Sequence, residues 1–313
     1  MRLRTGAIAP GPEAPAPSHS RAPGSPVPGF VARGHSDEPL APDFIVIGTM
    51  KGGTTALYRY LAQFPDIGLS RIKETDYFVA EKNFGLGPAW YRQQFSASAR
   101  LIGEVSPNYT KFDLFPGVPE RIARVAPNVR LIFIARDPVA RFASHYRHSW
   151  TVGHMRVRPE DLLASGNGRH MISCSSYAAQ IGRYRDWFDP RQFLFLDFDV
   201  LRTTPQAVCD ELALFLGMAK QQIGVEAPAN TAEDVARIPG ILQRAARTRM
   251  ARRFDRYLPP AMRMALRRAF ANRRPDTSPV LGAELLQRAA DLLRDDATSF
   301  RYLSGKDFAQ WRV

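Results

Sequence analysis

The chain is poor in cysteine, with two among 313 residues, Cys174 and Cys209. Two isolated cysteines form neither a metal-ligand spacing nor a disulfide framework, so we expect buried structural thiols in a reducing compartment. Apolar runs of 18 or more residues are also missing, which excludes a membrane-spanning helix from the printed sequence. Its first thirty residues lack the apolar core of a secretory signal, so we expect a cytoplasmic protein.

Positive charge is abundant but confined to one segment. The net charge is +13, and residues 237–274 alone hold twelve arginines and one aspartate, which leaves the remaining chain close to neutral. We predict a basic helical insertion of two short helices, split at Pro259 and Pro260, with apolar residues between the arginines. It could pack on the core as a solvated helical pair, contact an anionic membrane, or dock an anionic acceptor. Membrane or acceptor contact is favoured over binding of a nucleic-acid backbone, and no specific nucleic acid is expected.

The remaining chain divides into a tail and one domain. Residues 1–42 contain nine prolines and five glycines, a composition typical of a disordered tail. From residue 43 to residue 313, short apolar runs alternate with helical patterns. Strands are predicted over 44–48, 100–106, 129–137 and 192–201, with helices after residue 54 and over 118–127, 138–150, 175–188 and 205–218. This alternation predicts an α/β fold of three layers, with a central parallel sheet flanked by helices.

The first predicted strand leads into "GTMKGGTT", residues 48–55, which has the spacing of a P-loop. Glycines allow the backbone to approach an anion closely, and the amides of the following helix point at it. A nucleoside-triphosphate loop carries its lysine directly before the Ser or Thr. Here that position is Thr54, and the lysine is displaced to Lys51. A P-loop kinase or NTPase would also need a magnesium-binding aspartate, whereas Asp137 could equally cap the next helix.

The string "GTMKGGTTALY" instead resembles the 5′-phosphosulfate loop of sulfotransferases that use 3′-phosphoadenosine-5′-phosphosulfate (PAPS). The branch it resembles most contains the heparan sulfate N- and 3-O-sulfotransferases and their bacterial relatives. The resemblance implies a P-loop-type fold, PAPS as co-substrate and no required metal. It also implies cofactor-binding roles for Lys51, Gly52, Gly53, Thr54 and Thr55. Lys51 would have a catalytic role as well, because it would neutralise charge on the leaving oxygen.

A second string, "LIFIARDPVARFASHYRH", resembles the 3′-phosphate motif of the same family. The resemblance implies that Arg136 and Ser144 hold the 3′-phosphate, and an arginine fork suits that anion. Arg237, in "ARIP", matches a family arginine near the cofactor. His145 and His148 share a helix face and are predicted as surface or interface histidines, with a role as base kept as an alternative.

Further strings resemble the acceptor side of the same family. "IKETDYF" matches K-E-x-x-[FY]-F, and the resemblance implies that Glu74 is the catalytic base. A glutamate flanked by charged residues such as Lys73 and Asp76 can also be a solvated surface charge. "GPAWYRQQF" matches a helical segment, with Trp90 and Tyr91 expected near the acceptor cleft. In "GEVSPNYT", Val105 stands where some glycan-modifying members have lysine. The resemblance covers about residues 43–230 and resumes near residue 279.

These strings together imply a sulfotransferase. It would transfer a sulfuryl group from PAPS to a hydroxyl or amine of a carbohydrate or glycolipid acceptor. Two alternatives remain open on the sequence: a P-loop kinase or NTPase, and a non-catalytic basic protein that binds membranes or nucleic acid through residues 237–274.

Overall fold

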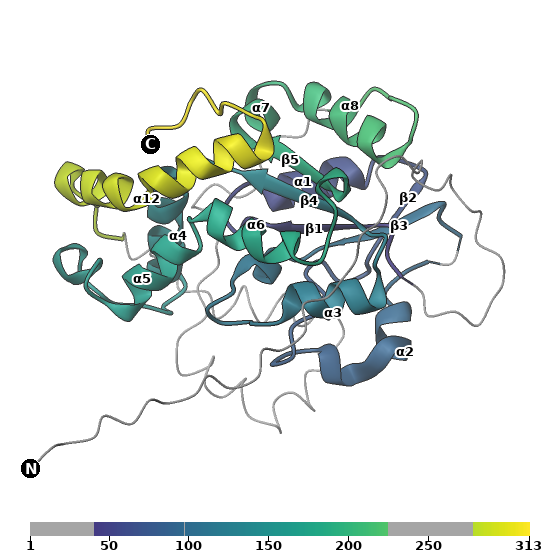
Figure 1. Ribbon diagram of the computed structural model, residues 1–313, viewed down its shortest axis with the longest axis horizontal. Coiled ribbons are helices and arrows are strands. Elements are labelled where there is room, and N and C mark those ends of the chain that lie inside the picture. Colours follow the sequence, from purple (N-terminus) through teal and green to yellow (C-terminus); the bar gives the residue numbers. More distant parts are fainter. Residues whose placement is uncertain (1–40, 97, 225–277) are drawn as a thin grey trace, which may run out of the picture. The chain divides into compact units, whose positions relative to one another are not determined.

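The computed structural model describes residues 41–96, 98–224 and 278–313. Its centre is a five-stranded sheet with the order β2-β3-β1-β4-β5, in which every neighbouring pair is parallel (Figure 1). The strands are β1 (Phe44–Gly48), β2 (Ile67–Leu69), β3 (Leu101–Val105), β4 (Arg130–Ala135) and β5 (Phe193–Asp197). The parallel sheet predicted from the sequence is therefore confirmed.

Helices connect the strands. They are α1 (Thr54–Leu61), α2 (Gly87–Arg92), α3 (Val118–Val125), α4 (Pro138–Thr151), α5 (Gly166–Ser173), α6 (Tyr177–Arg185), α7 (Phe198–Thr203), α8 (Pro205–Leu216) and α12 (Ala283–Ser304). Short 3-10 turns lie at Phe84–Leu86, Pro107–Thr110, Pro159–Asp161 and Pro190–Gln192. None of the helices in the described ranges is both long and apolar enough to cross a bilayer.

The central strand shows why the sheet is covered on both faces. Side chains of successive residues point to opposite faces of a strand. Phe44 and Val46 pack with α1, α7 and α8, whereas Ile45 and Ile47 pack with α3, α6 and α12. A strand that is buried on both faces must be apolar throughout, as "FIVIG" is. The result is the expected three-layer arrangement (Figure 1).

The long helix α12 joins the domain from far along the chain. It packs against α4 and α6, and the rings of Phe300 and Trp311 stack with centroids 5.9 Å apart. Asp296 accepts hydrogen bonds of 3.0 and 2.9 Å from the first-turn amides of α6. The amide of Arg312 donates to Asp137 across 2.6 Å. These contacts hold the C-terminal segment against α6 and against the β4–α4 connection.

One predicted strand ends too late, and several predictions concern residues outside the described ranges. The strand expected over 192–201 ends at Asp197, because this side chain accepts a hydrogen bond of 2.7 Å from the amide of Asp199 and begins α7. Strand β2 and helix α12 were not predicted. Residues 1–40 of the tail and the basic insertion, including Arg237, lie outside the described residues.

Candidate active site

The predicted site residues follow the carboxyl ends of neighbouring strands. Lys51 comes after β1, Glu74 after β2 and Arg136 directly after β4. Because all strands run parallel, these ends share one edge of the sheet, where open α/β folds bind their ligands. The topology therefore gathers residues that are 85 positions apart along the chain.

The turn after β1 lies tightly against β4. The amide of Thr49 donates to the carbonyl of Ile134 across 3.1 Å, and the amide of Gly52 donates to Thr49 across 3.0 Å. A Cβ atom on Gly52 would lie 2.9 Å from the carbonyl oxygen of Ile134. Glycine at this position therefore permits the close approach of the two backbones, and its own amide already has an acceptor within the turn.

The start of α1 has the geometry of an anion site. Gly53, the N-cap, has φ +98°, and a Cβ atom there would lie 2.6 Å from the ring of Phe198. The first amides of a helix have no acceptor within the helix. Those of Thr54 and Thr55 therefore face an anion placed before α1, with the positive end of the helix dipole behind them. Thr54 is buried and Thr55 is partly buried.

Lys51 lies in a strongly cationic environment. Burial lowers the pKa of its ammonium group, and the positive charges of Arg136, Arg147 and Arg141 lower it further, while Glu74 acts in the opposite direction. So many cations around one half-buried lysine destabilise one another unless an anion lies among them. The arrangement is suited to a ligand with several negative charges.

Arg136 contacts the turn after β1 and the start of α7. Its guanidinium donates to the carbonyl of Lys51 across 3.2 Å and lies 4.9 Å from the ring centroid of Phe198. The hydroxyl of Tyr177 donates to the carbonyl of Arg136 across 2.8 Å. Ser144 lies farther along, on α4, where it is partly buried and one turn before His148.

Glu74 lies on the loop after β2. Its side chain is 40% exposed and forms an ion pair of 2.6 Å with Lys73. Its backbone has φ +64°, and its amide donates to the carbonyl of Val105 across 3.1 Å. Its negative charge opposes the lowering of the pKa of Lys51 and of His148, so the carboxylate lies within electrostatic range of both groups.

The prediction of surface or interface histidines on α4 is wrong for His145, which is buried within the domain. His145 is 6% exposed, and its Nδ1 accepts a hydrogen bond of 2.6 Å from the guanidinium of the fully buried Arg141. Burial and the Arg141 charge lower the pKa of His145, so this ring is neutral. His148 is partly buried, and burial together with the Lys51 charge lowers its pKa to about 4.

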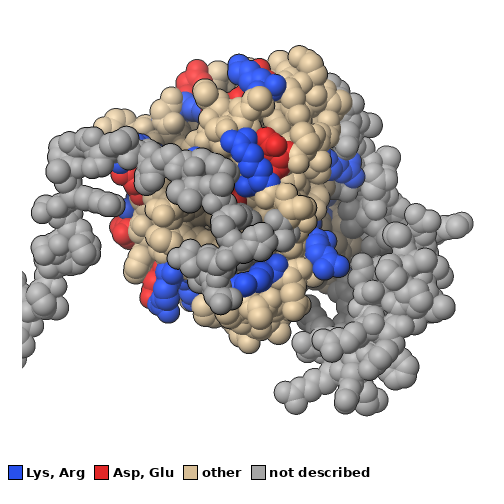
Figure 2. Space-filling view, turned by 90° about the vertical axis from the view of Figure 1, so that its right-hand side faces the viewer, with Lys and Arg blue, Asp and Glu red and all other residues tan. Residues whose placement is uncertain are grey.

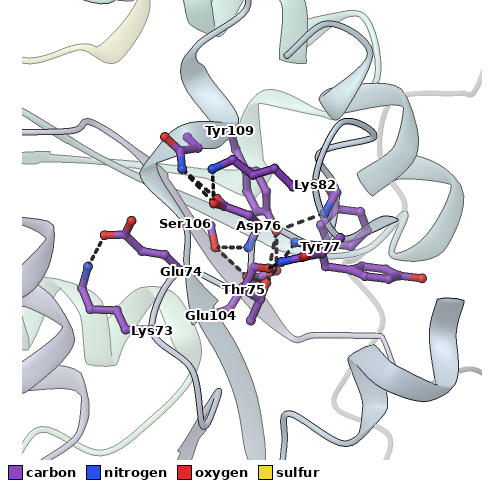
Figure 3. A network of polar contacts seen from close by, with 12 residues as sticks. Lys73, Glu74, Thr75, Asp76, Tyr77, Lys82, Glu104, Ser106 and Tyr109 are labelled. Carbon is purple, nitrogen blue, oxygen red and sulfur yellow. Dashed lines mark hydrogen bonds and ion pairs between the residues drawn. The ribbon is translucent and has the colours of Figure 1, made fainter. Parts of the chain in front are cut away.

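Sequence reasoning missed a polar network beneath the Glu74 loop (Figure 3). Glu104 on β3 is fully buried and accepts hydrogen bonds from the hydroxyls of Thr75, Tyr91, Ser106 and Tyr109. A charged residue within an apolar strand is rarely buried without partners, and this was the signal in the sequence. Tyr91 is 2% exposed and therefore belongs to the core under the loop, not to the wall of a cleft.

Two further residues of these segments are buried. Asp76 forms an ion pair with Lys82 and accepts hydrogen bonds of 3.0 and 2.9 Å from Asn108, so it is not a solvated charge. Val105 is fully buried among the apolar residues between the sheet and α1. Its side chain therefore points away from Glu74, and its carbonyl contacts the loop by accepting the hydrogen bond from the Glu74 amide.

Charges on the described surface are mixed in sign. Figure 2 shows lysine and arginine side chains separated by uncharged surface and interspersed with acidic ones on the face it presents. The arginine-rich segment 237–274 is not among the described residues. Across residues 41–96, 98–224 and 278–313, no three His, Cys, Asp or Glu side chains gather as metal ligands would.

Comparison with known proteins agrees with these motifs. The sulfotransferase domain family matches residues 41–233. The mouse bifunctional heparan sulfate N-deacetylase/N-sulfotransferase 4 is 31% identical over 198 residues, which are 56% of this chain and 22% of that protein. The human heparan sulfate glucosamine 3-O-sulfotransferase 3B1 is 28% identical over 205 residues, 63% of this chain and 50% of that protein. The chain thus spans a fifth to a half of the length of these curated relatives.

A solved structure shows the same fold. The crystal structure of a sulfotransferase from Alicyclobacillus acidocaldarius superposes with a TM-score of 0.62 at 21% identity, and the match covers 88% of this chain and all of that one. The family match extends from the first strand through α8, and so includes the P-loop, the Glu74 loop and the β4–α4 motif. The chain belongs to the sulfotransferase family.

Proposed function

We propose that the protein transfers a sulfuryl group from PAPS to a hydroxyl or amine of a carbohydrate or glycolipid acceptor. The observation that carries the proposal is the pairing of a cationic, P-loop-like cradle with one carboxylate at the same sheet edge. Lys51 and Arg136 form the cationic side, and Glu74 lies near enough for its negative charge to oppose the lowering of the Lys51 pKa. Relatives named as heparan sulfate N- and 3-O-sulfotransferases support an amine or hydroxyl of a carbohydrate as the acceptor.

The reaction is a single in-line displacement. The acceptor oxygen or nitrogen attacks sulfur while the bond between sulfur and the bridging phosphate oxygen breaks. Negative charge that develops on this leaving oxygen is neutralised by Lys51, and the first amides of α1 hold the 5′-phosphate. Arg136 and Ser144 hold the 3′-phosphate. Gly52 and Gly53 let the loop approach the nucleotide, which leaves as 3′-phosphoadenosine 5′-phosphate (PAP).

Glu74 acts as general base and takes the proton that the acceptor loses. Its partial exposure and its contact with Lys73 leave one carboxylate oxygen, Oε2, outside the ion pair. The histidines are poorer candidates for this role. His145 is neutral but its Nδ1 already accepts from Arg141, and the charge of Lys51 disfavours a second positive charge on His148.

The proposal is tested by transfer of radiolabelled sulfate from PAPS. Three acceptors are compared: N-deacetylated heparan, which offers amines, O-desulfated heparan sulfate, which offers hydroxyls, and an unsulfated galactolipid. Label should appear in at least one of them with wild-type protein and be lost with Glu74→Gln. Label in none of the three, with purified protein that binds PAP, would remove the carbohydrate or glycolipid acceptor from the proposal.

Contact with membranes is a separate proposal. We propose that the protein is cytoplasmic and contacts anionic lipid. The lipid contact is supported by the arginine-rich segment 237–274 and by a relative named membrane-associated sulfotransferase kil1 from Dictyostelium discoideum (39% identical over 113 residues). Sedimentation with vesicles of phosphatidylcholine, with and without phosphatidylserine, tests it. The protein should sediment only with the anionic vesicles, and less so at high salt.

A further inference from the structure

Glu104 is a buried carboxylate to which the proposed reaction gives no role. Each of its oxygens accepts two hydrogen bonds. Oε1 accepts from Tyr91 (2.7 Å) and Tyr109 (3.0 Å), and Oε2 accepts from Ser106 (2.8 Å) and from Thr75. A carboxylate has about four acceptor sites, so Glu104 has none left for a proton from a substrate. None of the described lysines or arginines forms an ion pair with it.

The hydroxyl partners connect Glu104 to the loop that carries Glu74. Thr75 is the residue next to Glu74, whereas Ser106 and Tyr109 follow the end of β3 (Figure 3). These same three hydroxyls also accept from loop amides. Ser106 Oγ accepts from Asp76 (3.3 Å), Thr75 Oγ1 from Tyr77 (3.2 Å) and the Tyr109 hydroxyl from Phe78 (3.2 Å).

A hydroxyl has a single hydrogen, so its orientation decides what it can accept. Each of the three hydroxyls gives its hydrogen to Glu104 and is left with lone pairs for an amide. An ionised carboxylate has no hydrogen to donate and can only accept. Ionised Glu104 therefore turns the hydrogens of all three hydroxyls towards itself. Burial raises the pKa of Glu104, and the four hydroxyl hydrogen bonds oppose that rise by stabilising the ionised form.

The loop requires such restraint because its backbone is unusual. Glu74 has φ +64° and Asp76 has φ +47°, values that residues with a Cβ atom seldom adopt. Such conformations persist only where the surroundings over-determine them. The network supplies these restraints on the residues directly after Glu74.

We propose that Glu104 is a positioning residue for Glu74. By taking the hydroxyl hydrogens of Thr75, Ser106 and Tyr109, it leaves their lone pairs for the amides of residues 76–78 and so fixes the backbone of the loop that carries the base. The inference rests on the proposed function in so far as Glu74 is the base of the reaction.

Three variants of the full-length protein separate positioning from mere packing. Thr75→Val keeps the shape of the side chain but removes the hydroxyl that joins the loop to Glu104. Thr75→Ser keeps the hydroxyl. Tyr91→Phe is the matched control, since it removes a donor to the same carboxylate from α2, which lies outside the loop.

Hydrogen–deuterium exchange measures the protection of the loop amides directly, and it needs no sulfate-acceptor substrate. Peptides that cover residues 73–79 should exchange at least tenfold faster in Thr75→Val, and within about threefold of wild type in Thr75→Ser and Tyr91→Phe. Peptides that cover β1 and β4 should be unchanged in all three variants, which excludes global unfolding as the cause.

Turnover gives the second readout, with PAPS as donor and the acceptor that accumulates label in the assay above. Thr75→Val should lower kcat at least tenfold at unchanged PAP affinity, and Thr75→Ser should restore it to within threefold of wild type. Equal loop exchange in Thr75→Val and wild type would overturn the proposal. So would an equal loss of kcat in Thr75→Val and Tyr91→Phe, because the carboxylate would then only stabilise the core.

Failure of the proposed function has a different signature. If wild-type protein does not bind PAP, the sulfotransferase mechanism fails, but faster loop exchange in Thr75→Val alone would still show that the Thr75 hydroxyl, which joins Glu104 to the loop, restrains the loop.

Discussion

The guanidinium of Arg136 donates a hydrogen bond of 3.2 Å to the main-chain carbonyl of Lys51. This bond joins the ends of β4 and β1, the two strands whose loops are proposed to hold the 3′- and 5′-phosphates. Arg136→Ala removes both the loop contact and a proposed phosphate partner. We expect PAP affinity to fall roughly tenfold to hundredfold, about 1.5–3 kcal/mol for hydrogen bonds to a charged group. Calorimetric titration measures this.

The matched control for this variant is Arg191→Ala. Arg191 is an exposed arginine that pairs with Asp189 on the surface, away from the strand ends. Its removal should leave PAP affinity within twofold of wild type. Equal losses in both variants would show that PAP responds to overall charge and not to Arg136.

Glu74→Gln separates binding from chemistry. The amide keeps the size of the side chain but cannot take a proton, so kcat should fall by roughly 10²- to 10⁴-fold. PAP affinity should stay within about threefold, because the carboxylate faces the acceptor. Glu120→Gln, which changes a surface glutamate paired with Arg124, is the control and should leave kcat unchanged. Unchanged turnover in Glu74→Gln would remove this residue from the mechanism.

The P-loop glycine can be tested by stability. In Gly53→Ala a methyl group would meet the ring of Phe198 at 2.6 Å in a backbone with φ +98°, so we expect a loss of about 1–3 kcal/mol in the free energy of unfolding. Gly182→Ala lies within α6, where a Cβ atom meets nothing within 4 Å. The free energy of unfolding of that variant should rise by about 0.5–1 kcal/mol. Urea unfolding compares the two, and equal effects of either sign would contradict the assigned strain.

Stability should depend on pH through His148. Its pKa is about 4 in the folded protein and about 6.5 in the unfolded chain. Between these values the unfolded chain binds a proton that the folded protein does not, so this contribution is complete above pH 6.5 and is lost as pH falls towards 4. We expect the free energy of unfolding to decrease by an amount on the order of 1–3 kcal/mol as the pH falls through this range. The lowered pKa of His145 acts in the same direction.

Thermal unfolding from pH 7 to pH 4.5 measures this slope. His148→Asn should flatten part of it, whereas His154→Asn, which changes an exposed histidine, should leave most of it in place. A slope that is unaltered in His148→Asn would contradict the assignment.

Much of the sheet could be predicted because its strands are buried on both faces. A run such as "RLIFIA" is short, apolar and followed by a proline, which favours a buried strand over a helix, although the prediction of 129–137 extends two residues beyond the strand's end at Ala135. Edge strand β2 has only three residues, "IGL", too few for any periodicity to show. The predicted strand over 192–201 is longer than β5 because Phe198 and Val200 continue the apolar pattern. In the structure, Asp197 caps α7 and so ends the strand.

The candidate site was predictable only where it is continuous in sequence. The P-loop, the Glu74 loop and the β4–α4 motif are short strings, so each could be recognised alone. The Glu104 network joins residues 75, 91, 104, 106 and 109 through tertiary contacts, and no spacing along the chain reveals it. The burial of His145 could not be predicted, because helical spacing gives a face shared with His148 but not what lies against that face, and His145 contacts the buried Arg141.

The central claim is that the cradle at Lys51 and Arg136 binds the nucleotide of PAPS and not a nucleoside triphosphate. Calorimetric titration of the purified protein with PAP, and separately with ATP and magnesium, tests this most directly. We predict micromolar or tighter binding of PAP that weakens roughly tenfold to hundredfold in Arg136→Ala, and much weaker binding of ATP with magnesium. Clear binding of ATP with magnesium and none of PAP would contradict the account, and the displaced lysine would then belong to a kinase or NTPase.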